Sequence, residues 1–190
     1  ISVNEVVVHG FPGSYELKEG DIIAVDCGVE LQGYHSDSAY TYPLPGVSPE
    51  VLNLLERTYE SLLIGISAAK AGSRTGDIGH AIQNYVEGHG LSVVREFVGH
   101  GVGRSVHEEP QVPNFVDSKC NQKLRPGMTI AIEPMVNAGL PGVKILNDGW
   151  TVVTQDGSLS AHFEHTVLIT ESEPEILTCP ENVPSKLKVS

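Results

Sequence analysis

One stretch of the chain, residues 99–110, reads Gly-His-Gly-Val-Gly-Arg-Ser-Val-His-Glu-Glu-Pro. Glycines at alternate positions let a backbone bend tightly and approach a ligand closely. His100 lies between two of these glycines, so its ring can point into a cavity without a crowding neighbour, and His107 follows after an expected turn. Taken alone, His100 fits an ordinary hydrogen-bonded histidine of a core or a surface. The acidic residues elsewhere in the chain decide between that interpretation and a ligand.

Carboxylates occur in apolar segments of the chain where a strand is expected. Asp26 follows Ile-Ile-Ala-Val, Glu133 follows Thr-Ile-Ala-Ile, and Glu164 begins a segment that continues into Val-Leu-Ile. An unpaired buried carboxylate is costly, and too few basic residues lie nearby to pair all three. A single acid of this kind would fit the solvent face of a half-buried strand. Three of them, together with Asp37 and His100, favour a metal cluster.

The chemistry of this set of donors indicates the kind of metal. Four carboxylates and one neutral imidazole carry four negative charges, which two divalent cations would balance. Oxygen-rich ligation with one nitrogen suits Mn, Fe(II), Co or Zn better than a thiolate site would. Asp26 and Asp37 flank an expected turn at Gln32-Gly33, so their side chains can meet on one face if the strand register allows.

The composition bounds the class of protein. With 190 residues, 40% of them hydrophobic and 19% charged, the chain suits one globular domain with a sizeable core. The net charge of -12 argues against a nucleic-acid or anionic-membrane surface. No apolar run approaches the roughly 20 residues of a membrane span. Three scattered cysteines, an odd number, indicate a reduced cytoplasmic protein.

Hydrophobic periodicity predicts helices at 49–71 and 75–88. Ser48 is a helix-capping residue, and Pro49 suits the first helical position. Gly72 ends the first helix. Two amphipathic helices of this length need an apolar face on which to pack.

Apolar and β-branched segments predict strands on both sides of this helix pair. The expected strands cover 2–8, 21–30, 34–42, 92–98, 128–136, 144–146, 150–154 and 162–170. We expect a loop at 108–126 and a loose tail from Pro174. Strands flanking a pair of helices indicate an α+β fold with the helices on one face of a sheet.

Several motifs together resemble type I methionine aminopeptidases. The resemblance runs from residue 1 to about residue 178, and its motifs are long and in the family's order. They are Asn4-Glu5-Val6-Val7-Val8-His9-Gly10, the hairpin with Asp26 and Asp37, residues 99–110, Glu133-Pro134-Met135 and Ser160-Ala161-His162-Phe163-Glu164-His165-Thr166. The resemblance implies the pita-bread fold, a curved antiparallel sheet with helices packed on its outer face and the metal site on its inner face. It also implies one catalytic domain over 1–178 and a loose tail over 179–190.

The resemblance assigns roles to the candidate site residues. Asp26, Asp37, His100, Glu133 and Glu164 would hold two divalent metal ions, with Asp37 and Glu164 bridging them. His9 and His107 would contact the substrate near the scissile bond. Glu133 would also carry a proton to the leaving amine. Trp150 would form one wall of the pocket for the methionine side chain.

The implied activity is removal of the N-terminal methionine from newly made proteins and peptides by attack of a metal-activated water. The implied partners are nascent polypeptides, with a transient contact to the ribosome. We expect no direct nucleic-acid binding and no membrane association. We expect the protein to be a monomer.

Two alternative functions remain open at this point. One is a pita-bread peptidase of the proline-specific aminopeptidase or prolidase type. The other is a non-catalytic peptide- or RNA-binding relative, although such relatives tend to lose metal ligands and none of the five is lost here.

Two departures from the family pattern bear on the substrate pocket. Family members have a further catalytic-domain segment before the residue that matches Ile1, and a bulky aromatic where this chain has Val106. We therefore expect a wider methionine slot and a weaker preference for methionine over leucine.

Overall fold

The computed structural model describes residues 1–178, which form strands packed against two helices. The helices are α1 (Pro49–Ala68) and α2 (Thr75–Gly88). The strands are β1 (Ser2–Val3), β2 (Val6–Val8), β3 (Ile22–Asp26), β4 (Val29–Leu31), β5 (Tyr34–Ser36), β6 (Ser38–Pro43), β7 (Ser92–Val93), β8 (Gly99–Gly101), β9 (Glu108–Val112), β10 (Thr129–Ile132), β11 (Met135–Asn137), β12 (Val143–Ile145), β13 (Val152–Thr154), β14 (Ser160–His162), β15 (Glu164–Leu168) and β16 (Glu175–Ile176).

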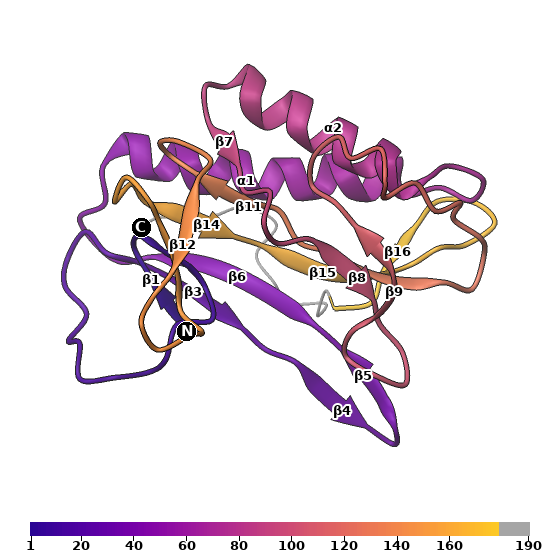
Figure 1. Ribbon diagram of the computed structural model, residues 1–190, viewed down its shortest axis with the longest axis horizontal. Coiled ribbons are helices and arrows are strands. Elements are labelled where there is room, and N and C mark those ends of the chain that lie inside the picture. Colours follow the sequence, from indigo (N-terminus) through magenta and orange to yellow (C-terminus); the bar gives the residue numbers. More distant parts are fainter. Residues whose placement is uncertain (179–190) are drawn as a thin grey trace.

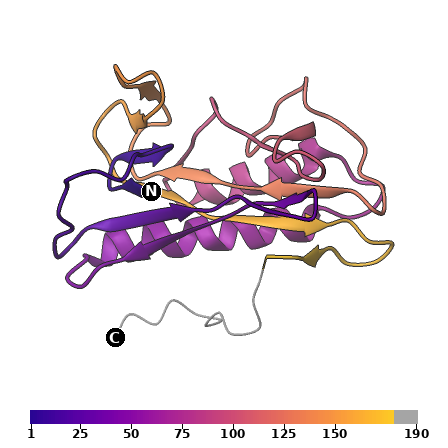
Figure 2. The same ribbon diagram turned by 90° about the horizontal axis from the view of Figure 1, so that it is seen from below.

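The largest sheet is antiparallel and orders its strands β1-β3-β6-β15-β10-β8-β9, with β16 added beside β15. Two three-stranded sheets, β14-β11-β7 and β12-β13-β2, extend it, and β4 and β5 form a separate hairpin. Figures 1 and 2 show both helices along one side of this curved arrangement. The α+β, pita-bread prediction is therefore confirmed.

The helices form where the sequence predicts them and cover an apolar layer. Ser48 accepts a hydrogen bond from the amide of Val51, which caps α1. The core between helices and sheet contains Leu54, Leu55, Leu62, Ile78, Ile82, Ile130, Ile132, Phe163 and Val167 among others. Neither helix within residues 1–178 is long and apolar enough to cross a bilayer.

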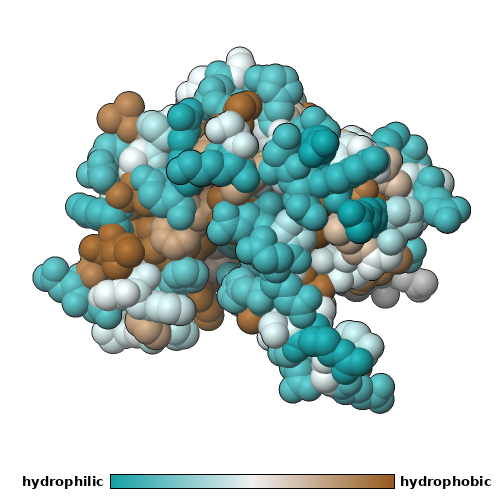
Figure 3. All heavy atoms as spheres, turned by 45° about the vertical axis from the view of Figure 1, so that its right-hand side comes forward, coloured by the Kyte–Doolittle hydropathy of each residue, from teal (hydrophilic) through white to brown (hydrophobic). Residues whose placement is uncertain are grey.

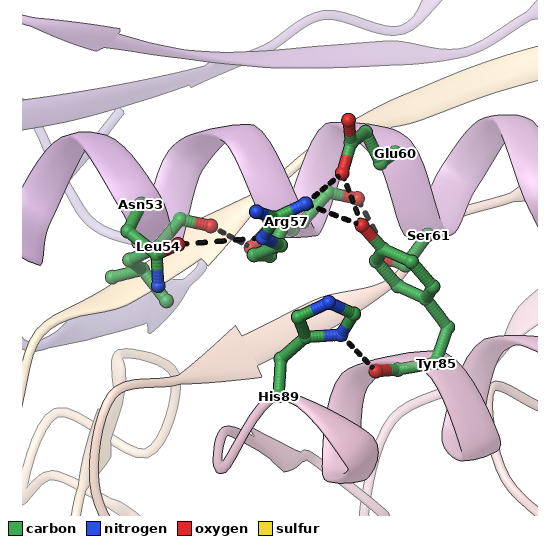
Figure 4. Close-up of polar contacts among 8 residues, drawn as sticks. Asn53, Leu54, Arg57, Glu60, Ser61, Tyr85 and His89 are labelled. Carbon is green, nitrogen blue, oxygen red and sulfur yellow. Dashed lines mark hydrogen bonds and ion pairs between the residues drawn. The ribbon is translucent and has the colours of Figure 1, made fainter.

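A polar cluster joins the two helices (Figure 4). The guanidinium of Arg57 on α1 donates to Glu60, at 2.7 Å, and to the hydroxyl of Tyr85 on α2, at 2.9 Å. The Tyr85 hydroxyl in turn donates to Glu60, and the His89 ring packs on the Tyr85 ring. This cluster ties α1 to α2 and contains none of the candidate site residues.

Several of the expected long strands are broken, and local chemistry explains two of the breaks. The strand expected at 2–8 is interrupted at Asn4, which adopts a left-handed backbone with φ of 56°. The strand expected at 128–136 breaks at Glu133-Pro134, because proline has no amide hydrogen for the ladder. The strand expected at 162–170 splits at Phe163, where the chain passes from β14 to β15. At each break, one continuous segment of the chain contributes a strand to each of two sheets.

Four further expectations need correction. The strand expected at 92–98 is only Ser92–Val93, and the one expected at 21–30 divides into β3 and β4. The loop expected at 108–126 contains β9, which pairs with β8. The tail expected to be loose from Pro174 first forms β16 against β15. The tail predicted at 179–190 lies outside the described residues.

Candidate metal centre

The order of strands in the main sheet brings the five predicted ligands to neighbouring positions. Asp26 ends β3, Asp37 directly precedes β6, Glu164 begins β15, Glu133 directly follows β10 and His100 is the middle residue of β8. These five strands are consecutive in the sheet. Residues from distant parts of the sequence therefore meet because their strands are neighbours.

Strand register places the donors on the face that the helices do not cover. Successive side chains of a strand point to opposite faces. Val167 packs in the core beneath the helices, so Glu164 and Thr166 point to the other face. Ala39 pairs with Asp26 on one side and with Glu164 on the other, which puts a small side chain between two carboxylates.

Three groups of potential ligand atoms result, and the atoms within each group lie within 4.8 Å of one another. Every one of the five predicted ligands belongs to at least one group. The groups are Asp26, Asp37 and Glu164; His100, Glu133 and Glu164; and Asp37, His100 and His107. Asp37, His100 and Glu164 each belong to two of them. A carboxylate in two groups, such as Asp37 or Glu164, can offer an oxygen to each of two cations.

The ring orientation of His100 suits a ligand. Its Nδ1 lies 3.0 Å from the carbonyl oxygen of Gly101. Because a carbonyl only accepts, Nδ1 carries the hydrogen and Nε2 presents a lone pair, as a metal-binding imidazole does. That Nε2 lies 3.4 Å from Oε1 of Glu133.

The electrostatics of the site favour a bound cation. Burial raises the pKa of the Glu164 carboxyl well above its ordinary value, and the nearby Glu133 and Asp37 raise it further. Burial and the charge of Asp26 raise the pKa of Asp37 to about 6. Oε1 of Glu164 is buried and has no hydrogen-bond partner in the structure. Acids this close and this poorly solvated fit divalent cations, which neutralise their charge and take up the free oxygen.

The three residues predicted to contact the substrate lie in loops near this cluster. His107 precedes β9 of the main sheet, and His9 and Trp150 lie next to β2 and β13 of a three-stranded sheet. The His107 ring packs against that of His100 at 4.3 Å between centroids, and burial and the nearby His100 lower its pKa. Its place in one donor group leaves a ligand role open for His107. His9 follows β2 with φ of 62° and stacks on Trp150 at 4.7 Å. Phe97 packs edge-on against His9.

Trp150 is 53% exposed, which is unusual for the wall of a closed pocket. Ile145 and Leu146 of the same hairpin are also exposed. Figure 3 shows a largely hydrophilic face with hydrophobic side chains gathered toward its left. The described residues thus leave the apolar surface around Trp150 open.

The loop that carries His107 is fastened to the β4–β5 hairpin. The amide of His35 donates to the carbonyl oxygen of Gly103 at 2.8 Å. The Arg104 guanidinium lies over the Tyr34 ring, 4.2 Å from its centroid, and donates to the Tyr34 hydroxyl at 2.9 Å. The hairpin exists because Gln32 and Gly33 both adopt positive φ, as a two-residue turn requires.

Sequence reasoning missed two residues beside the cluster. The imidazole of His162 is 2% exposed and its Nε2 lies 3.7 Å from Oε2 of Glu133. The hydroxyl of Thr166 accepts from the amide of Asp37 at 2.9 Å and donates to the Asp37 carbonyl at 2.8 Å, which fastens β6 to β15. Both residues lie two positions from Glu164. That spacing puts residues of one strand on the same face, so it was the available signal for both.

Comparison with known proteins places the chain in a family. The sequence profile of metallopeptidase family M24 matches residues 1–171. The chain belongs to this family. A methionine aminopeptidase of Clostridium perfringens is 58% identical over 178 residues, which cover 94% of this chain and 72% of the relative. The structure of methionine aminopeptidase from Thermotoga maritima superposes with a TM-score of 0.90 at 50% identity, covering 93% of this chain and 72% of that one.

More distant solved structures share the fold. A prolidase from Pyrococcus horikoshii gives a TM-score of 0.74 at 24% identity and covers 95% of this chain and 47% of its own. At that identity the likeness concerns the fold alone. The much higher identity to methionine aminopeptidases separates this M24 chain from the proline-specific alternative.

Proposed function

We propose that Asp26, Asp37, His100, Glu133 and Glu164 hold two divalent metal ions in a methionyl aminopeptidase, with Asp37 and Glu164 shared between the ions. The supporting observation is the buried, unpartnered Oε1 of Glu164, which lies among donors supplied by neighbouring strands. The donor chemistry fits Co, Mn, Fe(II) or Zn. When bound, two such cations supply Lewis acidity and make a nucleophile from water at neutral pH.

The chain's own residues carry the remaining steps. Glu133 takes a proton from the attacking water and passes it to the leaving amine. Burial and the nearby His100 lower the pKa of His107 and so favour its neutral form, whose N–H donates to the oxygen of the first peptide carbonyl. His9, held by its stack on Trp150 and its contact with Phe97, contacts the peptide near the scissile bond.

The substrate is a polypeptide that begins with methionine. The close relatives carry the name methionine aminopeptidase, and the chain shares 58% and 57% of its residues with two of them over 94% of its length. The product is a free methionine and a chain shortened by one residue. Trp150 supplies one apolar wall for the methionine side chain.

The decisive test combines metal content with a peptide panel. Protein depleted of metal and reloaded with Mn²⁺ or Co²⁺ should bind two ions per chain and cleave Met-Ala-Ser. It should leave dipeptides that end in proline intact. Cleavage of the proline dipeptides in preference to Met-Ala-Ser would instead indicate a prolidase, and binding without any cleavage would indicate a non-catalytic relative.

The biological setting follows from the same activity. We place the protein in the cytoplasm, where nascent chains are made and thiols stay reduced. Cys27 and Cys120 are free cysteines. Residues 1–178 act as one catalytic domain, a monomer that meets its substrate in transient contact with the ribosome.

A further inference from the structure

His162 is a buried imidazole to which neither the sequence motifs nor the proposed reaction gives a role. Its backbone is held on two sides. β14 pairs His162 with Met135 of β11, and the Thr41 hydroxyl accepts from the His162 amide at 2.9 Å and donates to its carbonyl at 2.7 Å. The ring itself is 2% exposed, and its Nε2 has no hydrogen-bond partner in the structure. A buried polar nitrogen without a partner is unusual, and an acceptor lies close to it.

That acceptor is the carboxylate of Glu133, which lies between two imidazoles. Its Oε1 is 3.4 Å from Nε2 of His100, and its Oε2 is 3.7 Å from Nε2 of His162. The backbone of Glu133 is held separately, because the side-chain amide of Asn114 donates to the Glu133 carbonyl oxygen at 3.1 Å. With the backbone held, the side-chain torsions of Glu133 decide which oxygen faces which imidazole. In the structure Oε2 lies just beyond hydrogen-bond distance of His162 Nε2.

We propose that His162 is a positioning residue: its Nε2–H donates to Oε2 of Glu133 and holds Oε1 toward His100 and Glu164. The proposal rests on the function proposed above for Glu133, as ligand and proton carrier. A carboxylate anchored through one oxygen offers the other in a fixed direction. Partners of this kind, which orient a ligand without touching the metal, change metal affinity or activity by about 10- to 100-fold when removed.

The proposal requires a hydrogen-bond donor at Nε2 and nothing else of the ring. A glutamine carboxamide keeps a donor at a similar distance from the backbone, whereas leucine fills similar space with none. His162→Gln should therefore retain the function, and His162→Leu should lose it. His165 gives a matched control, because its ring lies on the same segment but is hydrogen-bonded to the Thr178 hydroxyl, at 2.9 Å.

The experiment compares His162→Gln, His162→Leu and His165→Leu in the full chain. Titration calorimetry with Mn²⁺ measures affinity, and cleavage of Met-Ala-Ser gives kcat and KM. We expect His162→Leu to lose 10- to 100-fold in Mn²⁺ affinity or kcat with KM within about twofold. His162→Gln should stay within about threefold of wild type, and His165→Leu should match wild type in both measurements. In a Glu133→Gln background, His162→Leu should add little further loss.

One measurement is independent of catalysis. ¹⁵N NMR of the imidazoles in metal-free protein should show His162 protonated at Nε2, with a signal that shifts in Glu133→Gln. An unprotonated Nε2, an unchanged signal, or a His162→Gln variant as impaired as His162→Leu would overturn the positioning role. A wild-type chain that binds Mn²⁺ and cleaves nothing would overturn the proposed activity instead, while the calorimetry and NMR would still decide the role of His162.

Discussion

Asp26 and Glu164 lie in one row of the main sheet, separated by Ala39, which pairs with both. Ala39 belongs to β6, the strand between β3 and β15, and its short side chain leaves the carboxylates within reach of shared cations. Asp37, two residues earlier in the same chain segment, completes this acidic group. The proposed metal centre is therefore a property of strand register.

Replacing Glu164 with alanine should remove metal and activity together, because this carboxylate belongs to two of the donor groups. We expect less than one ion per chain by elemental analysis and a loss of kcat/KM of at least about 10²-fold. Full turnover with two ions still bound would refute the bridging role. Glu175→Ala, at an exposed position of β16, is a suitable control and should leave both values unchanged.

Replacing His107 with alanine should lower kcat while the metal content stays the same. Removal of one donor to a developing oxyanion typically costs about 10²- to 10³-fold in kcat. Steady-state kinetics and elemental analysis of the same sample separate the alternatives. A protein that loses an ion would show that His107 is a ligand, in line with its place beside Asp37 and His100.

Metal-free protein should lose stability as the pH rises from about 4 to about 6. Burial raises the pKa of Asp37 from 3.8 to about 6, so in this range the folded state keeps a proton that the unfolded chain has released. Asp37→Asn lacks this group, so its free energy of unfolding should fall less steeply over that interval. Urea unfolding of both chelated proteins at several pH values measures the difference.

Glu164 acts in the same direction, because its pKa is also raised. Added Mn²⁺ should restore stability at pH 7 and have little effect near pH 4, where protons compete with the cation for the carboxylates. Parallel pH profiles for wild type and Asp37→Asn would contradict this account.

Removing the Arg104 side chain should loosen the loop that carries His107. The guanidinium is exposed, and its contact with Tyr34 contributes only about 0.5–1 kcal/mol to the free energy of unfolding. The melting temperature should therefore change little. We expect kcat/KM to fall several-fold because His107 is less well placed. Arg95 offers a matched control: its guanidinium lies near the ring of Phe115 and pairs with Glu87. Arg95→Ala should keep wild-type kcat/KM, and equal losses in both variants would argue against a role for the loop contact.

Much of the site was predictable because its signals are local. Carboxylates in apolar segments, a histidine between glycines and a turn at Gln32-Gly33 can be recognised from neighbouring residues alone. The cap at Ser48 and the apolar periodicity likewise located α1, whose start agrees with the prediction. Burying an unpaired carboxylate is costly in any fold. Acids in apolar segments therefore indicate, from the sequence alone, that they need partners.

Other features depended on pairing between distant segments. The order β3-β6-β15-β10-β8 determines which carboxylates meet, and it is decided by contacts across the whole chain. Phe163 packs in the core, and His162 and Glu164 on either side of it lie beside Glu133, because β14 pairs with β11 and β15 pairs with β10. The amino-acid sequence by itself thus determined the donors, the helices and the family resemblance. Only the tertiary structure decided the grouping of the donors and the place of His162, because strand register is set by long-range hydrogen bonding and packing rather than by neighbours in the chain.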